Sequence, residues 1–271
     1  MNKIGFIVEM KDCQTPQALR RWVDLAQQQN IDGVELLFNA KCGLDFSVQK
    51  IKPAFENTPV EVAACGLWWL NTISPIKEER DEVRAYMLEF LDMVHDIGCK
   101  TAFFNTGEFA CGDTEKNISE FKKEYRFYKE YADARGITIA CYLGHGGNFV
   151  RSREILAKLC NEMPEFNLKL DTVGIMRNMK DDPYEIIKLF GNRLVHFHVK
   201  DIFRYGTDGF EIEPCVGMGD LRWNVIFGML YHHGYDGYIV IEPHGDLWSL
   251  PENRWKHIVL SKKHIEQFML R

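Results

Sequence analysis

Three residues in the second half of the chain could together hold a divalent metal ion, because they combine two carboxylates with one imidazole. They are Asp171 in "LKLD", His198 in "HFHVKD" and Glu242 in "YIVIEP". This mixture of ligands suits manganese, magnesium, zinc or ferrous iron. A metal in such a site polarises a carbonyl or hydroxyl group, so these residues predict proton abstraction next to a carbonyl carbon.

Asp171 and Glu242 belong to a larger set of acidic residues that lie within, at the end of or just beyond β-rich runs. Carboxylates packed together without a cation would repel one another and take up protons, so the set predicts a positively charged partner such as a divalent ion. The acidic residues of this set are Glu9, Glu35, Glu108, Asp171, Asp201 and Glu242.

The segment "LVHFHVKDI", residues 194 to 202, alternates in an unusual way for a buried strand. Side chains on a strand alternate between its faces, so Leu194, His196, His198 and Lys200 share one face. The other face is apolar. We therefore expect the polar face to look into a polar interior and to rise from its floor, at Leu194, to its rim.

Eight β-rich runs, each followed by a helical pattern, would provide such an interior. In a (β/α)8 barrel the strands turn one face to the axis, and their C-terminal ends open into the active-site mouth. The 271 residues contain no Pro/Ser-rich linker and no shift in composition, so we predict an α/β fold, a (β/α)8 TIM barrel with a single domain over residues 1–271. The expected strands are 3–9, 33–38, 60–66, 100–106, 137–143, 167–171, 194–201 and 238–243.

Composition and charge point to a small-molecule partner. The formal net charge of -6 and the pI near 5.9 disfavour binding to nucleic acid or to an anionic membrane surface. No apolar run approaches the roughly 18 residues of a membrane span. The 8 cysteines include no CxxC pair, which favours free thiols and a cytoplasmic protein. The sequence leaves open whether the chain forms a homo-oligomer.

Several segments resemble the xylose-isomerase-like superfamily, which contains sugar isomerases, epimerases and endonuclease IV-type barrels. They are "LKLDTVG", "HFHVKD" followed by Arg204, "GMGDLRW" and "YIVIEP". The most specific element is the HxKDxxxR run from His198 to Arg204. The resemblance implies a metal held by Glu, Asp, His and Glu from strands five to eight. Asp171, His198 and Glu242 match the last three positions, and Arg204 matches a residue that binds substrate phosphate or hydroxyl groups.

The first of these four ligands has no counterpart in the matching segment. The family segment ends a strand in Glu-Asn-His-Gly-Gly, whereas "ACYLGHGGN" places Leu143 or Tyr142 at the glutamate position, depending on the direction of counting. In the two-glutamate epimerase mechanism that residue is both a ligand and one of two opposed bases. Three alternatives follow: Glu108, His145 or Glu9 enters the coordination sphere, a water completes a three-residue site, or the site has no metal.

The endonuclease branch of the superfamily is a poor match. Its three-zinc site would need histidines at strands three and four and an Asp-x-His beyond strand seven. The chain has Asn105 at the strand-four position and Glu211-Ile-Glu213 at the position beyond strand seven. Together with the acidic pI, these differences argue against cleavage of phosphodiesters in DNA.

The resulting hypothesis is an enzyme that acts on a sugar, a sugar phosphate or an inositol derivative. Isomerisation or epimerisation is the expected reaction, and dehydration or another lyase reaction shares the same first proton abstraction. A second hypothesis is a barrel without catalysis or without metal, which binds a sugar or is the partner subunit of an active homologue. Metal content and its dependence on Asp171 and His198 would separate the two hypotheses.

Each candidate residue has an expected role in the first hypothesis. Glu242 would be both ligand and general base, with an opposing acid from another strand. The opposing acid would be Lys200, His145 or Glu108, and the substrate contacts would come from Arg204, Trp68 and Glu108.

Several residues also have a purely structural interpretation. His196 lies one layer deeper than His198 and fits a hydrogen-bonded core imidazole. Glu35 fits a polar network low in the barrel. Lys200, next to Asp201, would balance a carboxylate cluster as readily as it would act as an acid.

Overall fold

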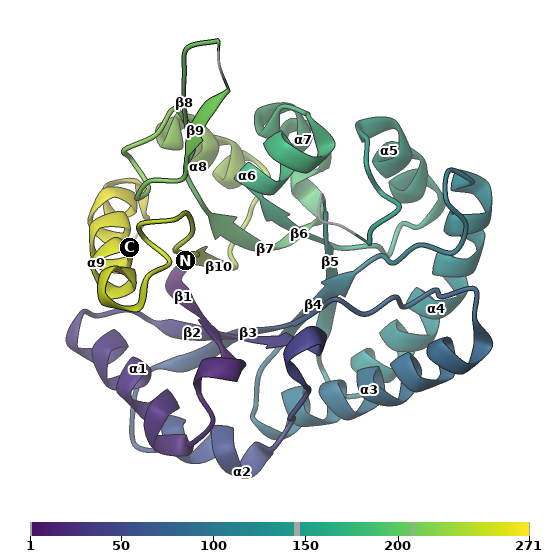
Figure 1. Ribbon diagram of the computed structural model, residues 1–271, viewed down its shortest axis with the longest axis horizontal. Coiled ribbons are helices and arrows are strands. Elements are labelled where there is room, and N and C mark those ends of the chain that lie inside the picture. The colour runs from purple at the N-terminus through teal and green to yellow at the C-terminus, as the bar shows by residue number, and fades with distance from the viewer. Residues whose placement is uncertain (1, 144–146, 208, 271) are drawn as a thin grey trace.

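The computed structural model describes residues 2–143, 147–207 and 209–270, which form a closed parallel barrel surrounded by helices (Figure 1). Around the barrel the strands follow the order β1-β10-β7-β6-β5-β4-β3-β2. Every strand expected from the sequence is present, and the predicted (β/α)8 TIM barrel is confirmed. The barrel strands are β1 Lys3–Glu9, β2 Gly33–Asn39, β3 Glu61–Trp68, β4 Thr101–Asn105, β5 Thr138–Tyr142, β6 Leu168–Asp171, β7 Leu194–Val199 and β10 Tyr238–Ile241.

Helices between the strands form the outer layer. The first of them begins as its sequence indicates, because Thr15 accepts a hydrogen bond from the Ala18 backbone N–H and Pro16 takes the first helical position. The helices are α1 Pro16–Gln28, α2 Val48–Ile51, α3 Lys77–Asp96, α4 Thr114–Asp133, α5 Arg153–Glu162, α6 Thr172–Gly174, α7 Pro183–Phe190, α8 Trp223–His232 and α9 Pro251–Ile265. A π-helical turn, η4 Ile175–Met179, continues α6. Short 3-10 turns are η1 Met10–Asp12, η2 Ala40–Cys42, η3 Lys52–Phe55, η5 Gly191–Arg193 and η6 Glu266–Phe268.

The two faces of the barrel strands are packed differently. The outer faces pack against the helices in one large apolar cluster. The inner faces carry two small apolar clusters, one around Leu37 and Val240 and one around Phe103 and Ala140. Ionisable side chains fill the rest of the interior, and each is at most 3% exposed: Glu35, Lys169, Asp171, His196 and His198.

The predicted inner position of Leu194 on β7 is wrong. Leu194 belongs to the helix-facing cluster, whereas Val195 packs against the inner cluster. The register between β6 and β7 is irregular at this point, because Leu168 pairs with Leu194 and the next residue, Lys169, pairs with His196. Such an irregularity re-aims the side chains around it. From His196 onward the predicted alternation holds.

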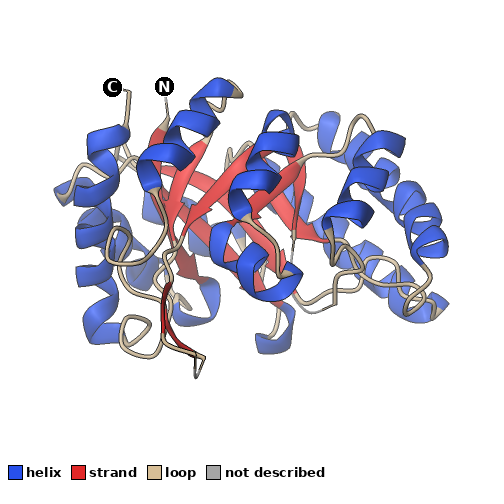
Figure 2. Ribbon diagram, turned by 90° about the horizontal axis from the view of Figure 1, so that it is seen from above, coloured by secondary structure: helices blue, strands red, loops and turns tan. Residues whose placement is uncertain are grey.

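A short antiparallel hairpin follows β7 and consists of β8 Phe203–Tyr205 and β9 Phe210–Ile212. Figure 2 shows that it projects from the end of the molecule opposite the two chain termini. This is the end where the barrel strands finish, and we call it the barrel mouth. In the described ranges, no helix is both long enough and apolar enough to cross a membrane.

Gly66 on β3 provides a test of the packing inside the barrel. A Cβ on Gly66 would overlap the ring of Phe103, whereas a Cβ on Gly228 in α8 would meet no atom within 4 Å. We predict that Gly66→Ala lowers the free energy of unfolding by about 1 to 3 kcal/mol through overpacking. Gly228→Ala should raise it by up to about 1 kcal/mol through helix propensity. Urea denaturation followed by circular dichroism measures both, and equal effects would contradict the packing described for Phe103.

Candidate active site

A buried cluster of charged side chains lies where β6, β7 and β10 end. Asp171 ends β6, Lys200 directly follows β7, and Glu242 directly follows β10. The Lys200 Nζ lies 3.2 Å from Asp171 Oδ2 and 3.5 Å from Glu242 Oε1. Each of the three residues is at most 5% exposed. Burial lowers the pKa of Lys200, but the charges of Asp171 and Glu242 outweigh burial and raise it, so the ammonium form is the stable one.

His198 lies between two carboxylates and contacts both. Its Nδ1 is 2.8 Å from Glu242 Oε2, and its Nε2 is 2.8 Å from Glu35 Oε2. A carboxylate only accepts hydrogen bonds, so both ring nitrogens carry a proton in this arrangement. Burial alone would lower the pKa of His198, but the charge of Glu35 reverses the shift and the pKa is raised. His198 therefore links the cluster at the mouth to a deeper carboxylate.

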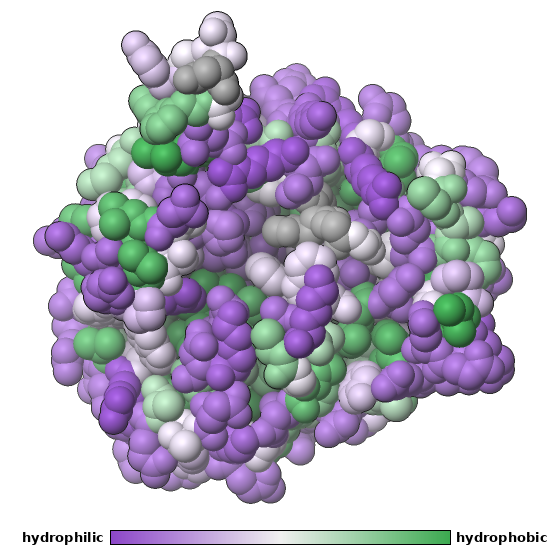
Figure 3. Space-filling view, in the orientation of Figure 1, coloured by the Kyte–Doolittle hydropathy of each residue, from purple (hydrophilic) through white to green (hydrophobic). Residues whose placement is uncertain are grey.

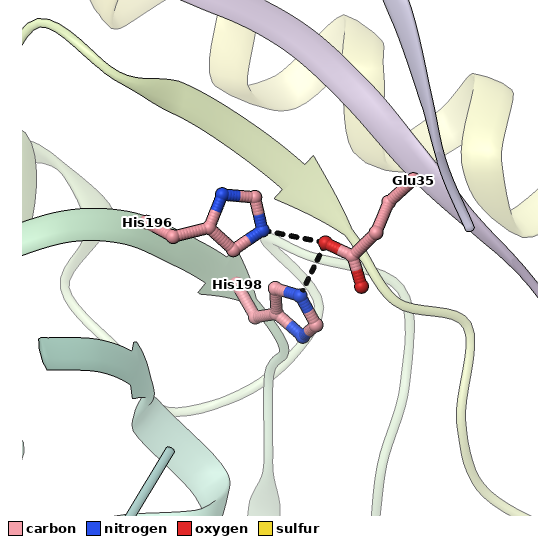
Figure 4. A group of neighbouring side chains, drawn as sticks. All are labelled: Glu35, His196 and His198. Atoms are coloured by element: carbon pink, nitrogen blue, oxygen red, sulfur yellow. Dashed lines mark hydrogen bonds and ion pairs between the residues drawn. The ribbon is translucent and has the colours of Figure 1, made fainter. Parts of the chain in front are cut away.

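Glu35 on β2 is that deeper carboxylate, and it is fully buried. Its Oε2 also accepts a hydrogen bond from His196 Nε2 at 2.5 Å, as Figure 4 shows. Burial raises the pKa of Glu35, but the charges of His198 and His196 and their hydrogen bonds outweigh it and lower the pKa to about 2. Burial lowers the pKa of His196. Glu35 and His196 thus fit the structural roles expected from the sequence, a polar network and a hydrogen-bonded core imidazole. Glu35 also holds His198 in place.

Lys169 on β6 is a second interior lysine, and the sequence reasoning did not single it out. It is 0% exposed, and its Nζ has no hydrogen-bond partner among the described residues. The Nζ lies 5.5 Å from the centre of the Phe103 ring. Burial lowers the pKa of Lys169. Alternation along "LKLD" would have placed Lys169 on the same face as Asp171, so the signal was present in the sequence.

Glu213 is another acidic residue of the site that the strand-end argument did not include. It follows β9, is 6% exposed, and places its Oε2 3.8 Å from Lys200 Nζ. Arg177 forms an ion pair with its Oε1, and His244 Nδ1 lies 2.9 Å from its Oε2. The position of Glu213 depends on a hairpin outside the barrel, so counting strand ends could not locate it.

Several predicted site residues lie at the rim, outside the buried cluster. Glu108 pairs with Arg151 at 2.8 Å. Arg204 is on the hairpin, its side chain is 44% exposed, and its Nε lies 2.5 Å from Glu211 Oε2. Trp68, at the end of β3, packs against Tyr142 with the ring centres 5.8 Å apart. The predicted acid His145 lies outside the described residues.

Asp201 was grouped with the acids of the mouth, but it has a different environment. Its carboxylate accepts hydrogen bonds from the backbone N–H groups of Gly217 and Leu221 and from Trp223 Nε1. A Cβ on Gly219 would collide with it. Asp201 therefore organises the "VGMGDLRW" loop, and the glycines of this segment let the backbone approach the carboxylate.

Tyr142 takes the inner position at the end of β5, where the resemblance to the xylose-isomerase-like superfamily implies a glutamate. Tyr142 packs with the inner cluster, whereas Leu143 belongs to the helix-facing cluster. The register pairs Tyr142 with Lys169 on β6. Burial raises the pKa of Tyr142 well above its usual value, so the side chain is neutral. This side of the site thus carries a neutral phenol and a lysine, and no carboxylate in the described part of β5.

The donor set at the mouth fits a divalent metal ion. One ligand atom each from Asp171, His198 and Glu242 can be chosen so that all lie within 4.8 Å of one another. Two carboxylates and an imidazole are suitable ligands for manganese, zinc or iron. The Lys200 ammonium already lies against the two carboxylates, so these oxygens accept a cation in this arrangement.

A cleft of about 620 Å³ adjoins this cluster and is lined by the hairpin and by the loop after β10. Glu213 and His244 both line the cleft. Glu213 also contacts Lys200 of the buried cluster, and His244 contacts Glu213, so these residues connect the cleft to the cluster. Figure 3 looks onto this face and shows hydrophilic side chains around its centre and hydrophobic ones over the hairpin. A cleft of this size accommodates a small organic ligand.

Comparison with known proteins gives consistent matches. The family model described as "Xylose isomerase-like TIM barrel" matches residues 23–260. A relative named inosose dehydratase, from Clostridium perfringens (strain 13 / Type A), is 23% identical over 248 residues, covering 81% of this chain and 81% of that protein.

Two solved structures share the fold. D-psicose 3-epimerase with D-tagatose, from Clostridium cellulolyticum H10, superposes with a TM-score of 0.76 at 14% identity and covers 98% of this chain and 99% of that one. The IolI protein with a binding zinc atom superposes with a TM-score of 0.75 at 14% identity and covers 99% of this chain and 100% of that one.

The buried Glu35 network predicts a pH-dependent contribution to stability. Its pKa is lowered from 4.5 to about 2, so its contribution is complete above pH 4.5 and is lost as the pH falls toward 2. A shift of this size corresponds to about 3 kcal/mol. We expect Glu35→Gln, measured in the metal-free protein, to lose about this much at pH 7 and to show a shallower decline below pH 4.5.

Glu61→Gln is the matched control for this measurement. Glu61 pairs with Lys3, and the two side chains are 55% and 45% exposed. Its replacement should change the free energy of unfolding by less than about 1 kcal/mol. Parallel pH profiles of stability for the Glu35→Gln protein and the unsubstituted protein would show that Glu35 is not ionised as described.

Proposed function

This chain belongs to the xylose isomerase-like TIM barrel family, and from that premise we propose that it is an enzyme acting on a sugar or inositol-type compound. The reaction would begin with removal of a proton from the carbon next to a carbonyl group. The observation that carries this proposal is the convergence of Asp171, His198 and Glu242 around the Lys200 ammonium at the barrel mouth.

Glu242 would be the general base. Burial raises its pKa, but the charges of Lys200 and His198 outweigh burial and lower the pKa well below the usual value. Its carboxylate is therefore ionised near neutral pH and can accept a proton. A divalent ion held by Asp171, His198 and Glu242 would polarise the substrate carbonyl and stabilise the negative charge of the enediolate.

The groups around Glu242 favour dehydration over epimerisation. Epimerisation needs a second base on the opposite face of the carbon, and Tyr142 at the end of β5 is a buried neutral phenol. Dehydration needs an acid for the leaving hydroxyl, and Lys200 is held as an ammonium next to Glu242. Glu242 would take the proton from carbon, the C–O bond of the neighbouring carbon would break as C=C forms, and the hydroxyl would leave as water with a proton from Lys200.

The relatives support both reactions to different degrees. The sequence relative named inosose dehydratase supports the elimination. The structural likeness to D-psicose 3-epimerase supports epimerisation of a ketose as the second candidate. Both reactions share the first proton transfer to Glu242, and they differ in whether a hydroxyl is then lost.

Proton exchange with solvent tests the first step and separates the two reactions. Inososes, ketoses and sugar phosphates would be incubated in deuterated water with Mn²⁺ or Zn²⁺ and analysed by NMR and mass spectrometry. We expect Glu242→Gln to lose exchange by a factor of about 10² to 10⁴, as is typical for a general base. Lys200→Met should keep exchange on an inosose and lose formation of the dehydrated product.

Lys3→Met, at an exposed ion pair, is the control and should behave like the unsubstituted protein. Exchange that leads to an epimer with no loss of water would favour the second candidate. If the metal-supplemented protein exchanges no substrate of the panel, the enzyme proposal is wrong, and a sugar-binding barrel or a partner subunit takes its place.

A further inference from the structure

Glu213 places a third carboxylate next to the Lys200 ammonium. Its Oε2 lies 3.8 Å from Lys200 Nζ, and the same nitrogen is 3.2 Å from Asp171 Oδ2 and 3.5 Å from Glu242 Oε1. The Oε2 of Glu213 is buried and accepts no hydrogen bond from the described residues. Three carboxylates from three separate segments therefore converge on one cation.

The position of Glu213 is fixed by the segments that follow β6 and β10. Arg177, in η4 after β6, binds its Oε1. His244 follows β10 and places its Nδ1 2.9 Å from Oε2, without hydrogen-bond geometry. Gly245 has a φ of +86°, and a Cβ there would lie 2.9 Å from the Glu213 backbone oxygen. The segments that follow β6 and β10 therefore both contact Glu213 and fix its position.

The opposite side of the site is unsuited to supply a further ligand for a cation. At the end of β5 the inner residue is the neutral Tyr142, and its register partner on β6 is Lys169. Neither residue is a carboxylate, whereas Glu213 offers a buried carboxylate oxygen that accepts no hydrogen bond from the described residues. The side of the site that carries Glu213 is therefore the better source of a further oxygen ligand.

We propose that Glu213 is the fourth protein ligand of the divalent-metal site, in place of the carboxylate that the superfamily supplies from strand five. This inference rests on the metal site of the proposed function and extends it to a segment outside the barrel strands. A metal ion bound there would share the carboxylates of Asp171, Glu213 and Glu242 with the Lys200 ammonium. The other ligands are Asp171, Glu242 and His198, whose ligand atoms lie within 4.8 Å of one another. Glu213 lies outside that group, so its carboxylate has to move toward the three ligands when the metal binds.

Glu211 offers a matched control for the alternative that Glu213 only neutralises Arg177. Both glutamates form ion pairs with Arg177, but Glu211 also pairs with the exposed Arg204. Among the described residues, only Glu213 of the two has an ion pair with Lys200. Glu211→Gln therefore removes a partner of Arg177 without changing the proposed ligand set.

The experiment measures metal binding directly. Apo-protein would be titrated with Mn²⁺ and Zn²⁺ by calorimetry, and the absorption spectrum of the Co²⁺ complex would report coordination. Loss of a group that merely orients a ligand typically weakens metal affinity 10–100-fold, so we expect Glu213→Gln to weaken it by at least tenfold. The Co²⁺ spectrum should change in Glu213→Gln and stay the same in Glu211→Gln, whose affinity should remain within about threefold.

The outcomes separate this inference from the proposed function. If Glu213→Gln binds metal with unchanged affinity and spectrum while Asp171→Ala does not bind, Glu213 is not a ligand and the proposed function stands. If the unsubstituted protein binds none of the three metals, both this inference and the metal site of the proposed function fail. Should Glu213→Gln fail to fold by circular dichroism, Glu213→Asp, which keeps the charge, takes its place. A changed metal affinity and Co²⁺ spectrum in Glu213→Asp would support ligation, and an unchanged affinity and spectrum would contradict it.

Discussion

The constraint on which the site depends is the burial of several carboxylates in one small volume. Such groups stay ionised inside a protein only if positive charges lie against them, because burial alone raises their pKa. Here the compensation is provided by ammonium and imidazolium groups on neighbouring strands. The acidic residues are Glu35, Asp171, Glu213 and Glu242, and the positive groups are Lys200 and His198.

His198 transmits this balance through the interior. One ring nitrogen contacts Glu242 at the mouth, and the other contacts Glu35 deeper in the barrel. The two carboxylates are therefore bonded to the same imidazolium. A metal at the proposed site would require the neutral imidazole, so its binding would displace a proton from His198, on Nδ1 if that nitrogen is the ligand. The hydrogen bond from Nε2 to Glu35 would then fix the tautomer and the orientation of the ring.

Much of the fold and part of the site could be predicted from the sequence, because both depend on local patterns. Period-two alternation and regular strand spacing identified all eight barrel strands, and the ends of three of them identified Asp171, His198 and Glu242. Leu194 was misplaced because a register irregularity between strands leaves no signal in a single strand. Glu213 was missed because a hairpin brings it to the mouth.

The inner residue at the end of strand five is Tyr142, its register partner on strand six is Lys169, and neither is a carboxylate. This absence restricts the chemistry of the barrel more than the presence of Asp171, His198 and Glu242 does. A glutamate on strand five would provide a ligand and a second base, and both are lost where Tyr142 takes the inner position. Its register partner Lys169 offers no oxygen ligand either. In the proposed reaction, Glu242 as the base and Lys200 as the acid would remove a proton and expel a hydroxyl, and no carboxylate on β5 would return the proton to the opposite face. This acid–base asymmetry is the reason why the proposed reaction is an elimination, although D-psicose 3-epimerase has a similar fold.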